Sequence, residues 1–198
     1  MLFIISLQIK AAESMDAPRN YGFEGKISRE VLDNYLSRAI TQLGLSHSKQ
    51  RDEDIRMLKN VGAKFIGRAE YLWGHPGDDE AYFKKVAETT ALVHAADREM
   101  IVQACIFEAI YNGVNKLPVP AWVFEEFELK PEARNFSYDA MLFDGGKFKN
   151  HWVPGASVPD MSKLETKMWF YYRARRYIDA GCEALHFGQV HLMDKNDK

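Results

Sequence analysis

The chain has 198 residues, of which 46% are hydrophobic and 27% are charged, and its formal net charge at pH 7 is -2. This composition is typical of a globular domain that buries a core, and it excludes intrinsic disorder. The small net charge excludes a global basic field of the kind that attracts nucleic acid or an acidic membrane surface.

The N-terminal segment, residues 1–20, is the first feature along the chain. It is apolar from Leu2 to Ile9, and small residues follow at Ala11 and Ala12, as at the end of a secretory signal peptide. No basic region precedes the apolar stretch, so two interpretations stay open: a clipped signal peptide of a secreted or periplasmic protein, and an apolar N-terminus of a cytoplasmic one. No other segment approaches the roughly 20 apolar residues that cross a bilayer, so no membrane span is expected.

The rest of the chain predicts strands that alternate with helices. Short runs rich in apolar and aromatic residues predict strands at 34–43, 63–71, 100–107 and 182–190. Helical spacing of apolar residues predicts helices at 52–61, 78–96 and 161–181. The first strand has an alternative, because apolar residues between 31 and 40 also fit one face of a helix. The strand is preferred because it makes the alternation regular.

A long segment after the third strand, residues 111–155, interrupts this order. It contains prolines and a Gly-Gly turn, so we expect an irregular insertion with one short helix near 122–127. Four of its side chains suit either a lid that stacks on sugars or an anchor for the insertion: Trp122, Tyr138, His151 and Trp152.

Alternation of strands and helices predicts parallel βα units. A doubly wound nucleotide-binding sheet is disfavoured because no glycine-rich phosphate turn follows the first strand. Polar side chains at the C-terminal tips of the strands are instead typical of a barrel mouth. We therefore expect an α/β fold in which 21–198 form half of a TIM-type (β/α)8 barrel.

Four stretches carry a resemblance to a known architecture: SREVLDNYLSRAIT, GAKFIGRAEYLW, VQACIFEAI and EALHFGQVHLM. They resemble the N-terminal half of a (β/α)8 barrel of glycoside-hydrolase type, as in uncharacterised bacterial proteins whose chains are longer. The resemblance implies a fragment of a carbohydrate-active hydrolase. The large retaining-glycosidase clan ends its fourth strand with Asn-Glu, whereas this chain has Gly188-Gln189 there.

Glu108 is the candidate catalytic residue. Glycoside hydrolysis uses two carboxyl groups, and Glu108 directly follows the third strand, where a barrel mouth begins. The alternative is a capping or ion-paired glutamate on the rim. A partner carboxylate is expected beyond Lys198.

Six further side chains are expected to bind substrate at the same mouth: Arg38, Arg68, Glu70, Trp73, Gln189 and His191. Arg68 and Glu70 are two apart on a strand and would share a face, either to orient a substrate or to form an internal ion pair. Gln189 and His191 would share a face in the same way. Gln189 could hydrogen-bond a sugar hydroxyl, and His191 could shuttle a proton or bind a metal, with a purely structural histidine as the alternative.

Other residue patterns suggest structural roles. Cys105 and Cys182 are expected to be buried free thiols. The basic run on the last helix, Arg173, Arg175 and Arg176, is interpreted as a solvated face. The histidines show no metal-ligand spacing, so neither a metal nor another cofactor is expected.

The function predicted from the sequence is therefore acid–base hydrolysis of a carbohydrate at the strand tips. The alternatives are a non-catalytic carbohydrate-binding or scaffolding barrel protein, and a barrel enzyme of another class such as a metal-dependent hydrolase. The expected partner is a carbohydrate or another small polar ligand, with no nucleic acid. A half-barrel has open sheet edges, so self-association through those edges is also expected.

Overall fold

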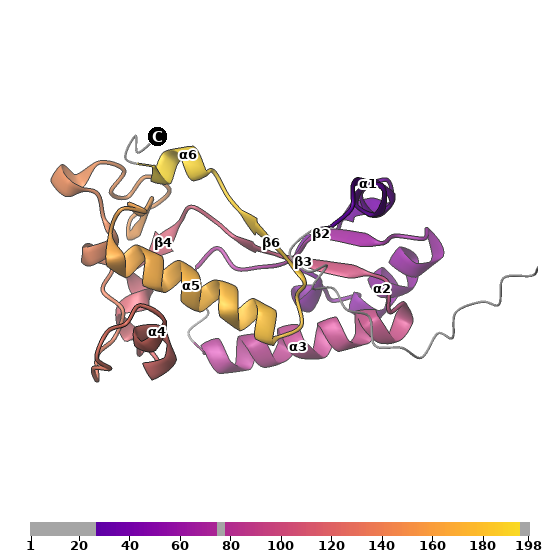
Figure 1. Ribbon diagram of the computed structural model, residues 1–198, viewed down its shortest axis with the longest axis horizontal. Coiled ribbons are helices and arrows are strands. Elements are labelled where there is room, and N and C mark those ends of the chain that lie inside the picture. The colour runs from indigo at the N-terminus through magenta and orange to yellow at the C-terminus, as the bar shows by residue number, and fades with distance from the viewer. Residues whose placement is uncertain (1–26, 75–77, 195–198) are drawn as a thin grey trace, which may run out of the picture.

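A parallel four-stranded sheet forms the centre of the molecule (Figure 1), in a computed structural model that describes residues 27–74 and 78–194. The strands follow the order β1-β2-β3-β6, with bounds β1 (Ala39–Thr41), β2 (Phe65–Tyr71), β3 (Ile101–Ile106) and β6 (Ala184–Phe187). Every neighbouring pair is parallel, so the expected α/β class with parallel βα units is confirmed. The N-terminal segment 1–20 lies outside the described residues.

Three long helices lie along one side of this sheet (Figure 1): α2 (Arg51–Asn60), α3 (Asp79–Ala96) and α5 (Leu164–Asp179). Right-handed crossovers place successive helices on the same face when strands are added in one direction. The Asp78 carboxylate caps α3 by accepting a hydrogen bond from the Ala81 amide at 2.9 Å. The described residues contain no helix that is long and apolar enough to cross a membrane.

The insertion between β3 and α5 consists of short elements joined by irregular backbone, as expected. It contains a short antiparallel pair, β4 (Ile110–Tyr111) with β5 (Ala156–Ser157), and the expected helix as α4 (Ala121–Glu126). Short 3-10 turns connect these elements: η3 (Asn112–Lys116), η4 (Asp139–Met141) and η5 (Asp144–Gly146).

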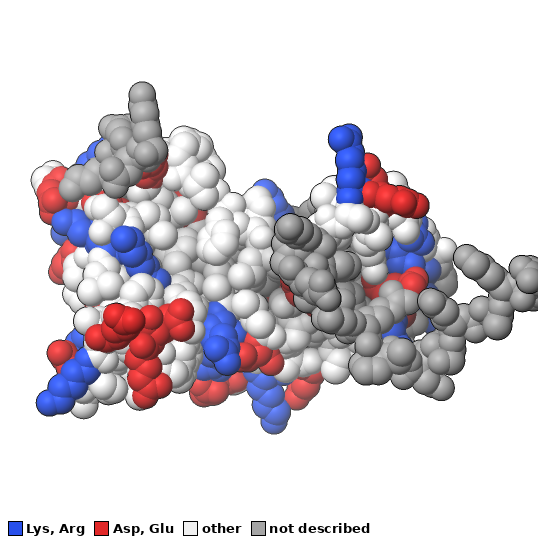
Figure 2. Space-filling view, viewed as in Figure 1, with Lys and Arg blue, Asp and Glu red and all other residues white. Residues whose placement is uncertain are grey.

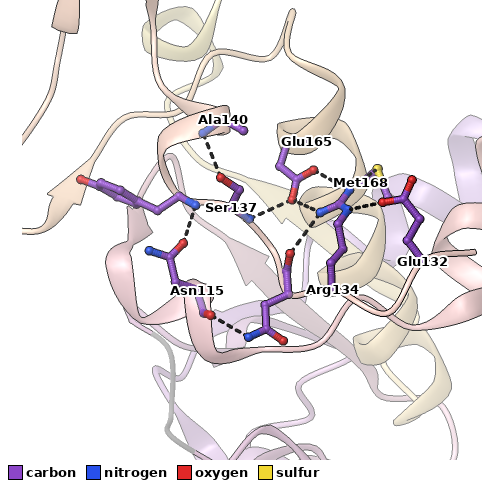
Figure 3. A network of polar contacts seen from close by, with 9 residues as sticks. Asn115, Glu132, Arg134, Ser137, Ala140, Glu165 and Met168 are labelled. Carbon is purple, nitrogen blue, oxygen red and sulfur yellow. Dashed lines mark hydrogen bonds and ion pairs between the residues drawn. The ribbon is translucent and has the colours of Figure 1, made fainter.

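A polar network fastens the insertion to α5 (Figure 3). The Arg134 guanidinium donates to both carboxylate oxygens of Glu165, at 2.8 and 2.9 Å, and the Ser137 amide donates to the same carboxylate at 2.8 Å. The Asn115 side chain accepts from the Tyr138 amide at 2.7 Å. These bonds satisfy polar groups that the insertion would otherwise bury without partners.

The first strand is shorter than predicted. Residues 34–36 belong to helix α1 (Arg29–Leu36), and only Ala39–Thr41 pair with β2. The helix is favoured because the Ser28 hydroxyl caps its first turn by accepting from the Val31 amide at 3.2 Å. Arg38 also donates to the Asn34 side chain across the end of this helix, at 2.9 Å.

The fourth strand is also shorter than predicted, because β6 ends at Phe187 and a short helix, α6 (Val190–Met193), follows it. Gln189 and His191 therefore do not alternate on a strand, and the prediction that they share a strand face is wrong.

The basic run on α5 is not uniformly solvated. Arg173 is only 5% exposed, and its guanidinium lies 3.0 Å from the Asp79 carboxylate of α3. Arg175 and Arg176 form ion pairs with exposed Asp179 and Glu80. The prediction of a solvated face is therefore wrong for Arg173, whereas the expected burial of both free cysteines is confirmed.

The surface in view carries side chains of both signs (Figure 2). Lysines and arginines are interspersed with aspartates and glutamates, and neither sign forms a continuous field on the described part of this face. The distribution agrees with the small net charge of the sequence.

Candidate functional site

A cleft of about 390 Å³ opens at the C-terminal ends of β2, β3 and β6. Its lining is contributed by segments far apart in the sequence, namely Arg68, Trp73, Phe107, Glu108, His186, Gly188, Gln189, Val190 and His191. The C-terminal edge of parallel strands is where α/β proteins place their binding residues. The cleft brings together five of the residues singled out from the sequence: Arg68, Trp73, Glu108, Gln189 and His191.

Two aromatic rings form a platform in this cleft. Trp73 stacks on Phe107 with ring centroids 4.2 Å apart and an interplanar angle of 6°, while 45% of Trp73 remains exposed. Trp152 of the insertion lies edge-on to Trp73, with centroids 6.3 Å apart, and its indole N–H donates to the Glu108 carbonyl at 3.3 Å. The insertion therefore supports the platform from the side, and the Trp73 ring is fixed while still accessible.

The Glu108 carboxylate joins the ends of β3 and β6. Glu108 is 1% exposed, and its two oxygens accept from the Gln189 amide at 2.8 Å and from the Gln189 side chain at 2.9 Å. Gly188 makes room for this arrangement, because a Cβ at this position would lie 1.8 Å from Glu108 Oε2. Gly188-Gln189 thus holds the carboxylate between the two strands.

A bulge in β2 presents Arg68 to the cleft. The pairing of β2 with β3 shifts between Ile66 and Glu70, and Arg68 has a φ of 55° in the left-handed region that side chains rarely adopt. The Arg68 amide donates to the Gln103 side chain at 3.2 Å, which fixes the bulge. The guanidinium carbon lies 6.0 Å from the centroid of the Phe107 ring.

The bulge also separates Arg68 from Glu70, so the prediction that they share a face is wrong. Alternation along a strand fails where an extra residue is inserted. Glu70 is 0% exposed and accepts from the Ser46 amide at 3.0 Å and the Ser46 hydroxyl at 2.5 Å. These bonds hold the turn η2 (Leu45–His47) against β2.

Burial governs the electrostatics of Glu70. Desolvation raises the pKa of Glu70 to about 7, although the hydrogen bonds from Ser46 and the charges of Lys85 and Arg51 act in the opposite direction. Glu70 does not line the cleft, so this carboxyl group is a part of the core rather than a group that meets a ligand.

Arg38 lies at the other end of the sheet. It immediately precedes β1, and its carbonyl accepts from the Lys64 amide just before β2, at 2.9 Å. Its distance from the strand tips excludes it from the cleft, because parallel strands place all their N-terminal ends at one edge.

The aromatic residues of the insertion also divide into those that pack in the core and those that reach the cleft. Trp122 stacks on Tyr172 with centroids 5.7 Å apart, and buried Tyr138 hydrogen-bonds the Ser157 hydroxyl. Both are anchors. Trp152 contacts the platform through Trp73, and His151 packs edge-on against Trp152 at 4.6 Å.

A second hollow, of about 410 Å³, also borders Trp73. It is lined by Gln42, Leu43, Gly44, His47, Ser48, Tyr71, Leu72 and Trp73. Trp73 lines both hollows, so the two spaces meet at this residue. In the described part of the chain, no three histidine, cysteine or acidic side chains gather as metal ligands.

Phe107 and His186 are site residues that the sequence reasoning missed. His186 is a polar side chain within the apolar run of β6, and this signal could have singled it out. Phe107 carried no such signal, because its stacking with Trp73 depends on the tertiary fold. Comparison of the chain with family models, with curated proteins and with solved structures gave no match, so the function of the cleft is inferred from its own side chains.

Proposed function

We propose that this protein binds a carbohydrate in the cleft at the C-terminal edge of its sheet. The observation that carries the proposal is the exposed Trp73 ring, held parallel to Phe107 and bordered by polar side chains. A sugar ring has an apolar face of C–H groups and a rim of hydroxyls. A flat aromatic surface with hydrogen-bonding groups at its edge complements both.

The two hollows that meet at Trp73 favour an oligosaccharide over a single sugar. The two hollows measure about 390 and 410 Å³ and share this one ring. A ligand of several sugar units would stack one unit on Trp73 and extend its neighbours into both hollows.

Binding without hydrolysis is the function that the described residues support best. Among those that line the cleft, Glu108 is the only carboxylate, whereas glycoside hydrolysis uses two. Both oxygens of Glu108 already accept hydrogen bonds from Gln189. Hydrolysis is the second candidate, because Glu108 stands at the end of β3 in the floor of the cleft, and it requires a second carboxylate that these residues do not supply.

The sheet itself supports a barrel origin for the site. Its strands are all parallel and follow chain order, and α2, α3 and α5 lie along one side, as in the first half of a (β/α)8 barrel. A doubly wound sheet would place helices on both sides. We propose that β1 and β6 are the edges at which a barrel would continue, either through further strands or through a second copy.

The experiment is calorimetric titration with a panel of hexasaccharides of different backbone sugars, both neutral and uronate. At least one should bind, and Trp73→Ala should weaken it about thirtyfold, as expected for an aromatic residue at the centre of an interface. Ile178→Ala is the matched control, since Ile178 is similarly exposed, at 52%, but lies on α5. Absence of binding to every member, or equal binding by the Trp73 variant, would refute the proposal.

The same samples separate binding from hydrolysis. Reducing ends should not accumulate during long incubation of the bound oligosaccharide. Accumulation that Glu108→Gln abolishes would establish the hydrolase instead.

A further inference from the structure

Arg68 differs from most arginines of the molecule in having no carboxylate partner among the described residues. Many of the others form an ion pair with an aspartate or glutamate, namely Arg29, Arg51, Arg56, Arg134, Arg173, Arg175 and Arg176. The Arg68 guanidinium instead lies against the Phe107 ring at the edge of the cleft.

The carboxylate that lines the cleft, Glu108, already accepts hydrogen bonds from the protein. Glu108 is 1% exposed and accepts two hydrogen bonds from Gln189. The cleft therefore combines an accessible guanidinium with a buried carboxylate that is satisfied by the protein itself. His186 and His191 add ring nitrogens to the same lining. This set of groups suits a ligand that carries negative charge.

The backbone supports a functional role for Arg68. A non-glycine residue at a φ of 55° is strained, and such strain is found preferentially at sites where it serves a function. The preceding Gly67 would adopt this conformation without strain, yet the left-handed position is occupied by arginine. The bulge re-aims this one side chain, while Ala69 and Glu70 remain buried in the core.

Resting on the carbohydrate site proposed above, we infer that its ligand is an acidic oligosaccharide whose anionic group binds Arg68. A planar guanidinium donates two parallel hydrogen bonds to a carboxylate or to a sulfate ester. One sugar unit would stack on Trp73, and the acidic group of that unit or its neighbour would meet Arg68. Uronate and sulfate oligomers share this chemistry, and the experiment separates them.

The test is calorimetric titration at fixed ionic strength with matched pairs of probes. Oligogalacturonate, oligomannuronate and oligoglucuronate are each compared with their methyl esters, and a sulfated galactan oligomer is compared with its desulfated form. An acidic member should bind between about tenfold and a hundredfold more tightly than its neutral partner, as expected for a hydrogen bond to a charged group. The pair that shows this difference identifies uronate or sulfate as the recognised group.

Arg68→Asn should reduce the affinity for the acidic probe to that for its neutral partner. Asparagine tolerates the left-handed conformation, so this variant removes the charge without breaking the bulge. Arg56→Gln removes the same charge from the exposed face of α2 and should leave both affinities unchanged. Thermal unfolding of each variant checks the fold.

Two results would overturn the inference while leaving the carbohydrate site in place. The first is equal affinity for acidic and neutral probes, and the second is an acidic preference that Arg68→Asn retains. Absence of binding to all probes would overturn the proposed function together with this inference.

Discussion

Arg173 and Arg68 are two arginines of one chain in opposite environments. Arg173 is buried between α3 and α5, where it pairs with Asp79 at 3.0 Å and donates to the Tyr177 hydroxyl at 3.2 Å. Its guanidinium also lies over the Phe83 ring, at 4.8 Å from the centroid. Arg68 has a strained backbone, lines a cleft and has no carboxylate partner in the described part of the chain.

The two environments distinguish a charge that stabilises the fold from a charge that is available to bind a ligand. Burying a guanidinium costs several kcal/mol unless carboxylate and hydroxyl groups compensate, and the surroundings of Arg173 supply both. Arg68 avoids this cost because it keeps access to solvent, so its donors remain available to a ligand. Completeness of the local hydrogen bonding therefore distinguishes the two roles better than residue type does.

Removal of the partner of Arg173 should give the largest effect. Asp79→Ala leaves a buried guanidinium without its carboxylate and deprives the Tyr172 hydroxyl of its acceptor. We expect a loss of about 3–5 kcal/mol in the free energy of unfolding, measured with urea.

The double variant Asp79→Leu/Arg173→Met is the control, because it removes both charges and should recover the part of the loss that comes from the unpaired guanidinium. Arg175→Ala breaks an exposed pair on the same helix and should cost less than about 1 kcal/mol. A small effect of Asp79→Ala would mean that Arg173 is not a structural charge.

Glu70 extends the comparison to a buried acid that forms no ion pair with the described residues. Its folded pKa of about 7 lies above the unfolded value of 4.5, so the folded state binds the proton more tightly. The contribution of Glu70 to stability is therefore fully present below pH 4.5 and is lost as the pH rises through 7. The total loss is about 3 kcal/mol.

Glu70→Gln should remove this part of the pH dependence, because an amide does not titrate. Its oxygen accepts from the Ser46 amide, and its NH2 group donates to the Ser46 hydroxyl, which changes from donor to acceptor. Urea unfolding of both proteins at pH 5 and pH 8 measures the difference. An unchanged dependence in the variant would assign the titration to another group.

Gly188→Ala tests whether the hydrogen bonds from Gln189 to the Glu108 carboxylate stabilise the protein. The added methyl group would displace Glu108 Oε2, which lies 1.8 Å from the Cβ position, and would break its bonds to Gln189. We expect a loss of about 2 kcal/mol in unfolding free energy. Gly67→Ala is the matched control, since its Cβ would lie at an ordinary 3.4 Å from Thr41. The double variant Gly188→Ala/Glu108→Ala has no clash, because the carboxylate is absent. Adding Gly188→Ala to Glu108→Ala should therefore change the unfolding free energy little. If the losses of the two single variants add in full, the clash is contradicted.

Local signals predicted the regular part of the fold. The acidic start and apolar spacing of 78–96 match α3, and the apolar runs at 63–71 and 100–107 contain β2 and β3. The expected alternation placed Arg68, Trp73, Glu108 and Gln189 at one edge because parallel strands share their C-terminal end.

Features that depend on distant partners were not predicted. The bulge at Arg68 relies on Gln103, 35 residues away, so strand alternation misplaced Glu70. The burial of Arg173 relies on Asp79, 94 residues away. The strand predicted over 34–43 was too long for a different reason. Its apolar spacing fits both the helical period and the strand period, and the cap at Ser28 favours the helix over its first residues.

Arg68→Gly should have the smallest effect on stability. It should stabilise the protein, whereas the substitutions above destabilise it. Glycine adopts a φ of 55° without the cost of about 1–2 kcal/mol that other residues meet there, and its greater freedom in the unfolded chain offsets part of this gain. We expect the free energy of unfolding to rise by about 0.5 kcal/mol, whereas Arg175→Gly in the interior of α5 should lower it by about 1 kcal/mol. If Arg68→Gly is destabilising, the side chain supports the fold, and Arg68 belongs in the same class as Arg173. If the variant is more stable and has also lost its preference for acidic oligosaccharides, the strain at Arg68 is retained for binding.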